Sequence, residues 1–180
     1  KDVGTRVFPV GRLDRDSEGL LLLTNDGDFA NAMMHPAAHI PKIYRVTLRA
    51  EVMPDQIRRF REGMLLDGKM TAPAEFDIVS FEPGGTDIPP RTVAQIVLYE
   101  GRNRQIRRMC EKLGLEVVRL RRVAVGSVKL GMLPIGKWRH LKPKEVRDLL
   151  VASKVEQKIA ASYIKQGKEG GIRAYHHSRR

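Results

Sequence analysis

The chain has 180 residues, 42% of them hydrophobic and 30% charged, which suits one globular domain or a domain with a tail. No run approaches the roughly 18 apolar residues of a membrane span, and no apolar signal segment opens the chain. Cys110, the one cysteine, has no partner for an internal disulfide. These features exclude a disulfide-stapled secreted scaffold, and we expect a cytoplasmic protein without membrane contact.

The positive charge is concentrated in the second part of the chain. The formal net charge is +12, but residues 1–100 hold 12 basic and 15 acidic residues, whereas residues 101–180 hold 21 basic and 6 acidic ones. Such asymmetry in a globular chain favours a polyanionic partner, with nucleic acid ahead of anionic lipid or acidic protein. The alternative is a generic solvated basic surface.

The first elements predicted are a buried strand and a short helix. Four leucines at 20–23 lie between turn residues, which is typical of a strand buried on both faces. Asp26 or Asp28 can cap a helix over 29–34 that ends before Pro36.

The middle of the chain alternates between strand and helix patterns. Apolar and polar residues alternate over 44–48, the period of a half-buried strand. Pro54 is placed to open a helix and Gly63 to end it. Two more strands are predicted over 75–81 and 92–99, separated by a loop rich in glycine and proline.

A helix capped by Asn103 is predicted next, with Gly114 as the residue that ends it. Its apolar stripe has helical spacing and consists of Ile106, Met109, Cys110 and Leu113. Strands over 117–125 and 127–130 and an amphipathic helix from Pro143 follow. Without regular βαβ alternation, this order indicates an α+β fold. Beyond about residue 165 the segment is polar and basic, so we expect it to be disordered.

Arginines crowd the first turns of the helix predicted from Asn103. Arg102, Arg104, Arg107 and Arg108 stand where the helix dipole is positive and cations are disfavoured. Unpaired amide groups at a helix start also attract anions. The pattern favours a phosphate or carboxylate site there; a solvated face balanced partly by Glu111 is the alternative.

A second dense segment, GRLDRDSEG, precedes the leucine strand. Its alternating carboxylates Asp14, Asp16 and Glu18 resemble the start of a calcium loop, but Asn25 stands where the bidentate glutamate would be. Calcium is therefore not expected, and the phosphate motifs GxGxxG and GxxxxGK[ST] are absent. A surface turn with solvated charges is the alternative to a functional loop.

Four segments together resemble the RsuA/RluB-type pseudouridine synthases, which modify ribosomal RNA: GRLDRDSEGLLLLTNDG, KIYRV, EGRNRQIRRM and VVRLRRVAVGSVKLGMLPIGKWRHL. The resemblance implies the pseudouridine synthase fold, a mixed, mostly antiparallel central sheet with flanking helices, as a catalytic domain over residues 1–151. Residues 152–180 are expected to be a helix extension and a basic, disordered tail. Family members carry a small RNA-binding domain ahead of the catalytic one, and we expect this sequence to lack it.

The resemblance also implies a set of site residues. Asp14 matches the catalytic aspartate of the GRLD motif, and Arg12 and Leu13 of the same motif are expected in the substrate pocket. Tyr44 matches the tyrosine of K-x-Y-x-V and Arg107 the arginine of Q-[IV]-R, and both are expected in the pocket.

The implied chemistry requires an ionised Asp14 shielded from water. Uridine becomes pseudouridine when the bond from the anomeric carbon to the ring nitrogen breaks and the turned base rejoins through carbon 5. The carboxylate can attack the anomeric carbon, as in retaining glycosidases, or remove the neighbouring sugar proton to give a glycal. A guanidinium beside it, from Arg107 or alternatively Arg104, would lower the pKa of an aspartate by roughly 1–3 units. Tyr44 offers a ring face to the base.

The RNA would be held by phosphate contacts, which position a strand without reading its sequence. The residues expected there are Arg102, Asn103, Arg104, Arg108, Arg119, Arg121 and Arg122. The implied function is isomerisation of a specific uridine in ribosomal RNA, with large-subunit RNA preferred, by a monomer that needs no metal or other cofactor. A non-catalytic ribosomal-RNA-binding or ribosome-assembly factor is the alternative. Asp14 separates the two, because a pure binder gains nothing from a carboxylate beside its phosphate track.

Overall fold

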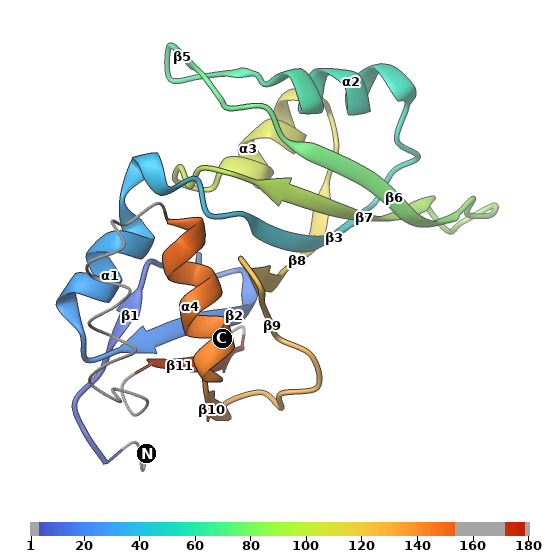
Figure 1. The fold of residues 1–180 in the computed structure, drawn as a ribbon. Coiled ribbons are helices and arrows are strands. Elements are labelled where there is room, and N and C mark those ends of the chain that lie inside the picture. Colours follow the sequence, from blue (N-terminus) through green and yellow to red (C-terminus); the bar gives the residue numbers. More distant parts are fainter. Residues whose placement is uncertain (1–3, 154–171, 179–180) are drawn as a thin grey trace. The chain divides into compact units, whose positions relative to one another are not determined.

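The computed structural model describes residues 4–153 and 172–178. The chain divides into two compact units (Figure 1). Unit 1 combines Lys1–Ile40 with Val123–Arg180, and unit 2 is Pro41–Arg122. Each unit contains both helices and antiparallel strand pairs, so the predicted α+β class is confirmed. The domain boundary predicted at residue 151 lies inside unit 1 and stays a prediction.

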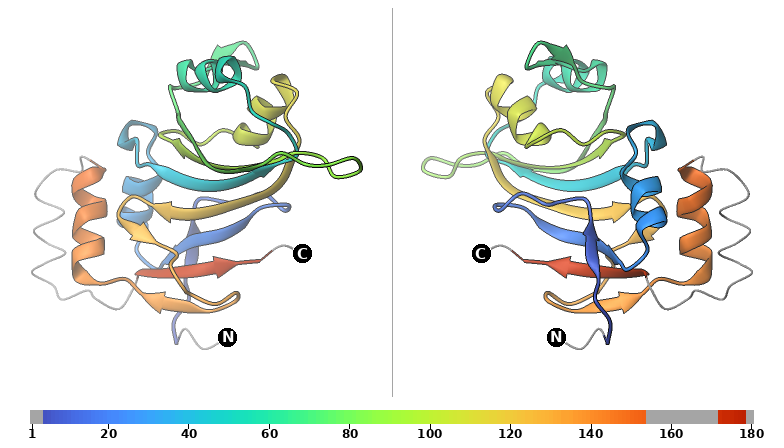
Figure 2. Two further views of the ribbon diagram at one scale, coloured as in Figure 1. Left: turned by 90° about the vertical axis from the view of Figure 1, so that its right-hand side faces the viewer. Right: turned by 90° about the vertical axis from the view of Figure 1, so that its left-hand side faces the viewer.

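Unit 1 is built on three antiparallel strands in the order β10–β11–β2 (Figure 2). These strands are Trp138–His140 (β10), Ile172–His177 (β11) and Glu18–Thr24 (β2). The short strand β1 (Phe8–Val10) pairs with β2, and β9 (Val128–Lys129) pairs with the end of β8 (Val117–Val125). Along β8 the chain passes from unit 2 into unit 1.

Helices of unit 1 share a hydrophobic core with one face of these strands. They are α1 (Gly27–Met34), a 3-10 turn η1 (Pro36–Ala38) and α4 (Pro143–Ala152). Of the two predicted caps, Asp26 and Asp28, it is Asp26 that caps α1, because its Oδ1 accepts the Phe29 N–H at 2.9 Å. The core includes Leu20, Leu22, Phe29, Met33, Leu149, Leu150, Ile172 and Ala174.

The prediction of a disordered tail is wrong for residues 172–177. These residues form β11, whose Ile172 pairs with Thr24 and whose His177 pairs with Gly19. Ile172 and Ala174 supply the apolar positions of a strand and are buried against the core of unit 1. A strand is stabilised by its neighbours, and those of β11 lie far away in the sequence, so the polar composition of the segment was misleading. Residues 154–171 lie outside the described part of the chain.

Unit 2 is built on strands in the order β3–β7–β6, again antiparallel. They are Lys42–Leu48 (β3), Arg91–Leu98 (β7) and Glu75–Glu82 (β6). A two-stranded hairpin is formed by β4 (Leu65–Leu66) and β5 (Lys69–Met70). The helices are α2 (Pro54–Glu62) and α3 (Gln105–Lys112).

The core of unit 2 lies between its strands and its two helices. Its members include Val46, Leu48, Phe60, Phe76, Ala94, Ile96, Ile106, Met109, Cys110 and Leu113. Gly114 ends α3 as predicted: it has a φ of 70° and donates to the Glu111 carbonyl, while Leu115 donates to the Cys110 carbonyl, a Schellman motif.

The predicted start of α3 is wrong by one residue. Arg104, not Asn103, is the N-cap, with a left-handed φ of 47° and no side-chain capping bond. Gln105 compensates for this start, because its Oε1 accepts the Arg102 N–H at 3.0 Å. A left-handed arginine is uncommon, so the surrounding contacts must hold the backbone in this conformation.

Candidate functional site

Asp14 lies in unit 1, in a tight turn four residues before β2 begins. The Ser17 N–H donates to the Asp14 carbonyl at 3.0 Å, which closes the turn. Ser17 and Glu18 are buried beyond it, whereas Asp14 is half-buried. The buried leucines of β2 therefore anchor a loop whose aspartate still reaches the surface.

The Asp14 carboxylate has no hydrogen bond or ion pair within residues 4–40, 123–153 and 172–178, the described part of unit 1. The two pocket residues predicted from the same motif lie in this loop: Arg12 is exposed and Leu13 is half-buried. Arg107 and Arg104, the two arginines considered as partners of Asp14, belong to unit 2.

Tyr44 lies on β3 of unit 2, opposite Ile96 of β7. It is half-buried and packs against the core of unit 2, so one side of its ring is fixed. Lys42 is two residues away on the same face of the strand.

Sequence reasoning missed Lys42 as a candidate site residue. Burial lowers the pKa of the Lys42 ammonium, and the nearby Arg122 guanidinium lowers it further. A lysine two residues from a half-buried tyrosine on the same strand face is suited to contact a phosphate. The signal that could have pointed to it is the lysine of the K-x-Y-x-V motif, which is Lys42 in this sequence.

Arg107 lies on α3 and is half-buried. Its Nη1 donates to the Val117 carbonyl at 3.3 Å, so the side chain is tied to the first residue of β8. Cys110, one turn further on, is not a nucleophile: burial raises the pKa of its thiol to about 12, although Arg107 opposes the shift.

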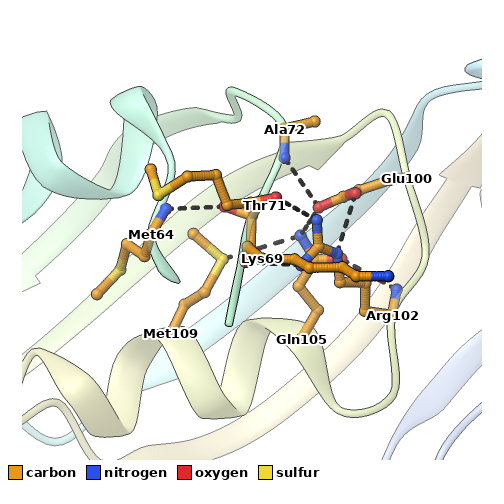
Figure 3. Close-up of polar contacts among 9 residues, drawn as sticks. Met64, Lys69, Thr71, Ala72, Glu100, Arg102, Gln105 and Met109 are labelled. Carbon is orange, nitrogen blue, oxygen red and sulfur yellow. Dashed lines mark hydrogen bonds and ion pairs between the residues drawn. The ribbon is translucent and has the colours of Figure 1, made fainter. Parts of the chain in front are cut away.

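Ahead of α3, a polar network holds the arginine-rich loop (Figure 3). The Glu100 carboxylate accepts from Ala72 N at 3.0 Å, from Gln105 Nε2 at 2.7 Å and from Arg102 Nε at 3.2 Å. Arg102 Nη1 also donates to the Lys69 carbonyl at 3.0 Å. This predicted RNA-binding residue thus connects the loop to the β4–β5 hairpin.

Arg108 is also engaged within unit 2. It forms an ion pair with Asp67, which raises the pKa of the Arg108 guanidinium and lowers that of the Asp67 carboxyl. The negative charge that the sequence led us to expect beside the α3 arginines is therefore supplied in part by Glu100 and Asp67.

The remaining predicted RNA-binding residues differ in exposure. Asn103 and Arg104 are exposed at the start of α3. On β8, Arg119 is exposed and Arg121 half-buried on one face, and Arg122 lies buried on the other. The β8 arginines therefore do not form one continuous surface.

Among the residues that the structure describes, no three histidine, cysteine, aspartate or glutamate side chains are grouped as metal ligands. No helix in residues 4–153 and 172–178 is long and apolar enough to cross a membrane.

The chain is similar to known proteins along most of its length. A family model described as RNA pseudouridylate synthase matches residues 1–112. The ribosomal large subunit pseudouridine synthase B of Bacillus subtilis is 40% identical over 149 residues, which are 83% of this chain and 59% of that protein. The dual-specificity RNA pseudouridine synthase RluF of Escherichia coli is 39% identical over 144 residues, 80% of this chain and 46% of that protein.

A solved structure supports the same assignment. A crystal structure of a pseudouridylate synthase matches with a TM-score of 0.70 and 35% identity, covering 79% of this chain and 59% of that one. The chain thus spans about half to three fifths of the length of these relatives. The predicted pseudouridine synthase fold and the resemblance read from the motifs are confirmed, and the chain belongs to the RNA pseudouridylate synthase family.

Proposed function

We propose that this chain is the catalytic domain, over residues 1–151, of an enzyme that isomerises a specific uridine in ribosomal RNA to pseudouridine. The observation that carries the proposal is a family match that includes the whole Asp14 loop. One relative is a ribosomal large subunit pseudouridine synthase, which favours large-subunit RNA as substrate. The enzyme is proposed to act in the cytoplasm as a monomer, without a metal or other cofactor.

Asp14 is the proposed catalytic residue. Its carboxylate has no hydrogen bond or ion pair in the described part of unit 1, so the group is available to a ribose. In one route it displaces the base nitrogen from the anomeric carbon, and carbon 5 of the turned base then displaces the carboxylate. In the other route it takes the neighbouring sugar proton as the bond to the base nitrogen breaks, and this proton returns to the sugar when carbon 5 bonds to the anomeric carbon. In both routes the freed base nitrogen takes up a proton and the proton on carbon 5 is lost to solvent. Arg12 and Leu13 are proposed to line the pocket.

Residues of unit 2 are proposed to receive the base and the phosphates. Tyr44 would stack on the uracil with the ring side that its core contacts leave open, and Arg107 would supply positive charge to the pocket. Of the predicted RNA-binding residues, the exposed Asn103, Arg104 and Arg119 are the best placed for phosphate contacts. The target nucleotide must be extruded, because a uridine inside structured RNA is out of reach.

Tritium release tests the proposal directly. The chain is incubated at micromolar concentration with large-subunit and, separately, small-subunit ribosomal RNA labelled with tritium at carbon 5 of uridine. We expect release from the large-subunit RNA that reaches a plateau of one equivalent per RNA. Release from small-subunit RNA alone would overturn the substrate preference. RNA binding without release from either RNA would overturn the enzyme and leave a binding factor.

A further inference from the structure

The strands of unit 1 have a second face, opposite the hydrophobic core, that carries aromatic and basic side chains. In antiparallel pairs, directly opposite residues share a face. Trp138 of β10 lies opposite Tyr175 of β11, and His140 lies opposite Arg173. His177 follows Tyr175 by two residues and shares its face. We call this set, Trp138, His140, Arg173, Tyr175 and His177, the aromatic face.

The side chains of the aromatic face contact one another. The Arg173 guanidinium carbon lies 5.0 Å from the centre of the Trp138 ring, a cation–π contact. The His140 ring meets Trp138 edge-on with centroids 5.1 Å apart, and Tyr175 and His177 are 6.5 Å apart. Arg173 is 4% exposed, whereas His140 is exposed and the other three rings are half-buried. The side chains thus hold one another through these contacts, and the rings remain partly exposed to solvent.

β11, which carries most of this face, is firmly anchored. The Gly136 N–H donates to the His176 carbonyl at 2.9 Å, and the His176 N–H donates to the Lys137 carbonyl at 3.1 Å. His176 is buried, and its ring Nδ1 lies 2.7 Å from the Leu133 carbonyl, to which it must donate. The backbone that carries the rings of Tyr175 and His177 is therefore held in place.

The described strands of unit 1 place no acidic side chain on this face. On its side, β2 contributes Gly19, Leu21 and Leu23, so none of the described residues that β2, β10 and β11 place there is acidic. Lys137 is exposed next to Trp138. An RNA strand fits this chemistry better than an acidic or apolar protein surface, because its bases can stack on the rings and a phosphate can contact the exposed Lys137.

The aromatic face also reaches the Asp14 loop along the sheet. His177 at the end of β11 pairs with Gly19, five residues after Asp14. β10 and β11 both lie outside residues 1–112, which the family model matches.

We propose that the aromatic face is a stacking surface for unpaired nucleotides that flank the target uridine. The inference rests on the proposed function, because it assigns the RNA that Asp14 acts on. Unpaired rather than duplex RNA is the occupant, because a ring can stack only on a base whose face is open.

Trp138 is the chain's one tryptophan, so its fluorescence reports on this face alone. The full chain is titrated with a fluorescein-labelled, unpaired oligoadenylate of eight nucleotides, following dye anisotropy, and with the unlabelled oligonucleotide, following tryptophan emission. We expect Trp138 emission to be quenched with the same Kd that anisotropy reports. Binding with unchanged Trp138 emission would overturn the surface.

Variants identify the contribution of stacking. Tyr175→Ala should weaken binding about tenfold, the usual loss of one stacked base, whereas Tyr175→Phe keeps the ring and the affinity. Phe81→Ala removes an aromatic ring that is 41% exposed on β6 of unit 2, and it should leave the affinity and the Trp138 quench unchanged. An equal loss for Phe81→Ala and Tyr175→Ala would overturn the proposal, since it would show no preference for this face.

Two further outcomes would distinguish the stacking surface from a contact between copies of the chain and from the proposed function. If Tyr175→Ala alters the sedimentation coefficient of the protein but not RNA affinity, the face is a contact between copies of the chain and the proposal is wrong. If the wild-type chain quenches on RNA but releases no tritium from ribosomal RNA, the proposed function fails while the stacking surface stands.

Discussion

Asp14 and Glu100 lie in segments of similar composition, GRLDRDSEG in unit 1 and EGRNRQ in unit 2, but the structure uses their carboxylates in opposite ways. Glu100 accepts hydrogen bonds from Ala72, Arg102 and Gln105, and its side chain is 23% exposed. Asp14 has no hydrogen bond or ion pair in the described part of unit 1.

The difference separates a carboxylate that maintains structure from one that is available for chemistry. A half-buried carboxylate with three donors is already stabilised in its charged form, and reaction with a ligand would break those contacts. A carboxylate without such donors can approach a sugar carbon at little structural cost. Both segments combine glycine, arginine and acid, so composition does not reveal which role each carboxylate has.

Replacing the aspartate gives the largest expected effect. Asp14→Asn should lower the rate of tritium release at least about a thousandfold, because an amide neither bonds to the anomeric carbon nor accepts the sugar proton. RNA affinity should stay within a few-fold, since phosphate contacts are unchanged. Asp16→Asn, two residues along the same loop, is the matched control and should keep its rate within about tenfold. A normal rate for Asp14→Asn would remove this residue from catalysis.

Glu100→Gln should instead reduce stability. The amide presents an N–H group to either Arg102 or the Ala72 and Gln105 donors, so at least one charged hydrogen bond is lost. We expect the free energy of unfolding, measured by urea titration with circular dichroism, to fall by about 2 kcal/mol.

Two control variants test whether this loss of unfolding free energy is specific to Glu100. Glu111→Gln, at an exposed position of α3, should change the free energy of unfolding by less than about 0.5 kcal/mol. Asp14→Asn should behave like Glu111→Gln in this measurement. If Asp14→Asn destabilised the protein as much as Glu100→Gln, the contrast between the two carboxylates would be false.

Glu145 extends the comparison of Asp14 with Glu100. It lies in unit 1, as Asp14 does, but its carboxylate accepts several hydrogen bonds, as that of Glu100 does. It accepts from both terminal nitrogens of Arg139, at 2.8 and 2.7 Å, and from the Lys142 N–H at 2.8 Å. The hydrogen bonds from Arg139 lower the pKa of the Glu145 carboxyl, and the backbone bond from Lys142 adds to the effect. Glu145→Gln should therefore cost about 1–2 kcal/mol of unfolding free energy at pH 7.

The pH dependence follows from the direction of that shift. The pKa of Glu145 is lower in the folded than in the unfolded chain, so the unfolded chain binds the proton first as the pH falls. The stabilisation is present above the ordinary value of 4.5 and is lost as the pH falls through the lowered value. The difference between wild type and Glu145→Gln should shrink as the pH is lowered below 4.5. Asp148→Asn, in the same helix but paired with an exposed lysine, should show little difference at either pH.

Local residues made much of the fold predictable. The apolar run of β2, the Asp26 cap of α1 and the glycine that ends α3 each depend on neighbours within a few positions. β11 could not be predicted in this way, since its pairing partner β2 is about 150 residues earlier in the sequence. Its basic and histidine-rich composition resembled that of a tail.

The contacts of the candidate site residues were also not predictable from local sequence, because they involve residues distant in the chain. Motif resemblance selected Asp14, Tyr44 and Arg107, but the roles of the arginines depended on distant groups. Arg102 contacts the β4–β5 hairpin, more than 30 residues earlier, and Arg108 contacts Asp67. Sequence alone showed these arginines as an excess of positive charge, because it does not reveal which carboxylates fold against them.

The Arg108–Asp67 pair allows the smallest but most specific test of the comparison. The side chains are 27% and 77% exposed, so the pair adds little stability, and Arg108→Ala should change the free energy of unfolding by less than about 1 kcal/mol. If Arg108 contacts a phosphate, the same change should weaken RNA binding a few-fold and reduce the slope of log Kd against log salt by about 0.7–0.9. Arg58→Ala, on α2, should leave that slope unchanged.

Asp67→Asn then decides whether Arg108 resembles Arg102 or is available to RNA. A phosphate that binds Arg108 must displace the Asp67 carboxylate, so removing that charge should tighten RNA binding about two- to threefold at low salt. This gain in RNA affinity should disappear when Asp67→Asn is combined with Arg108→Ala. Asp67 and the phosphate then no longer compete for the Arg108 guanidinium. Equal affinities for Asp67→Asn and wild type, with a normal salt slope for Arg108→Ala, would mean that Arg108 serves structure alone, as Glu100 does.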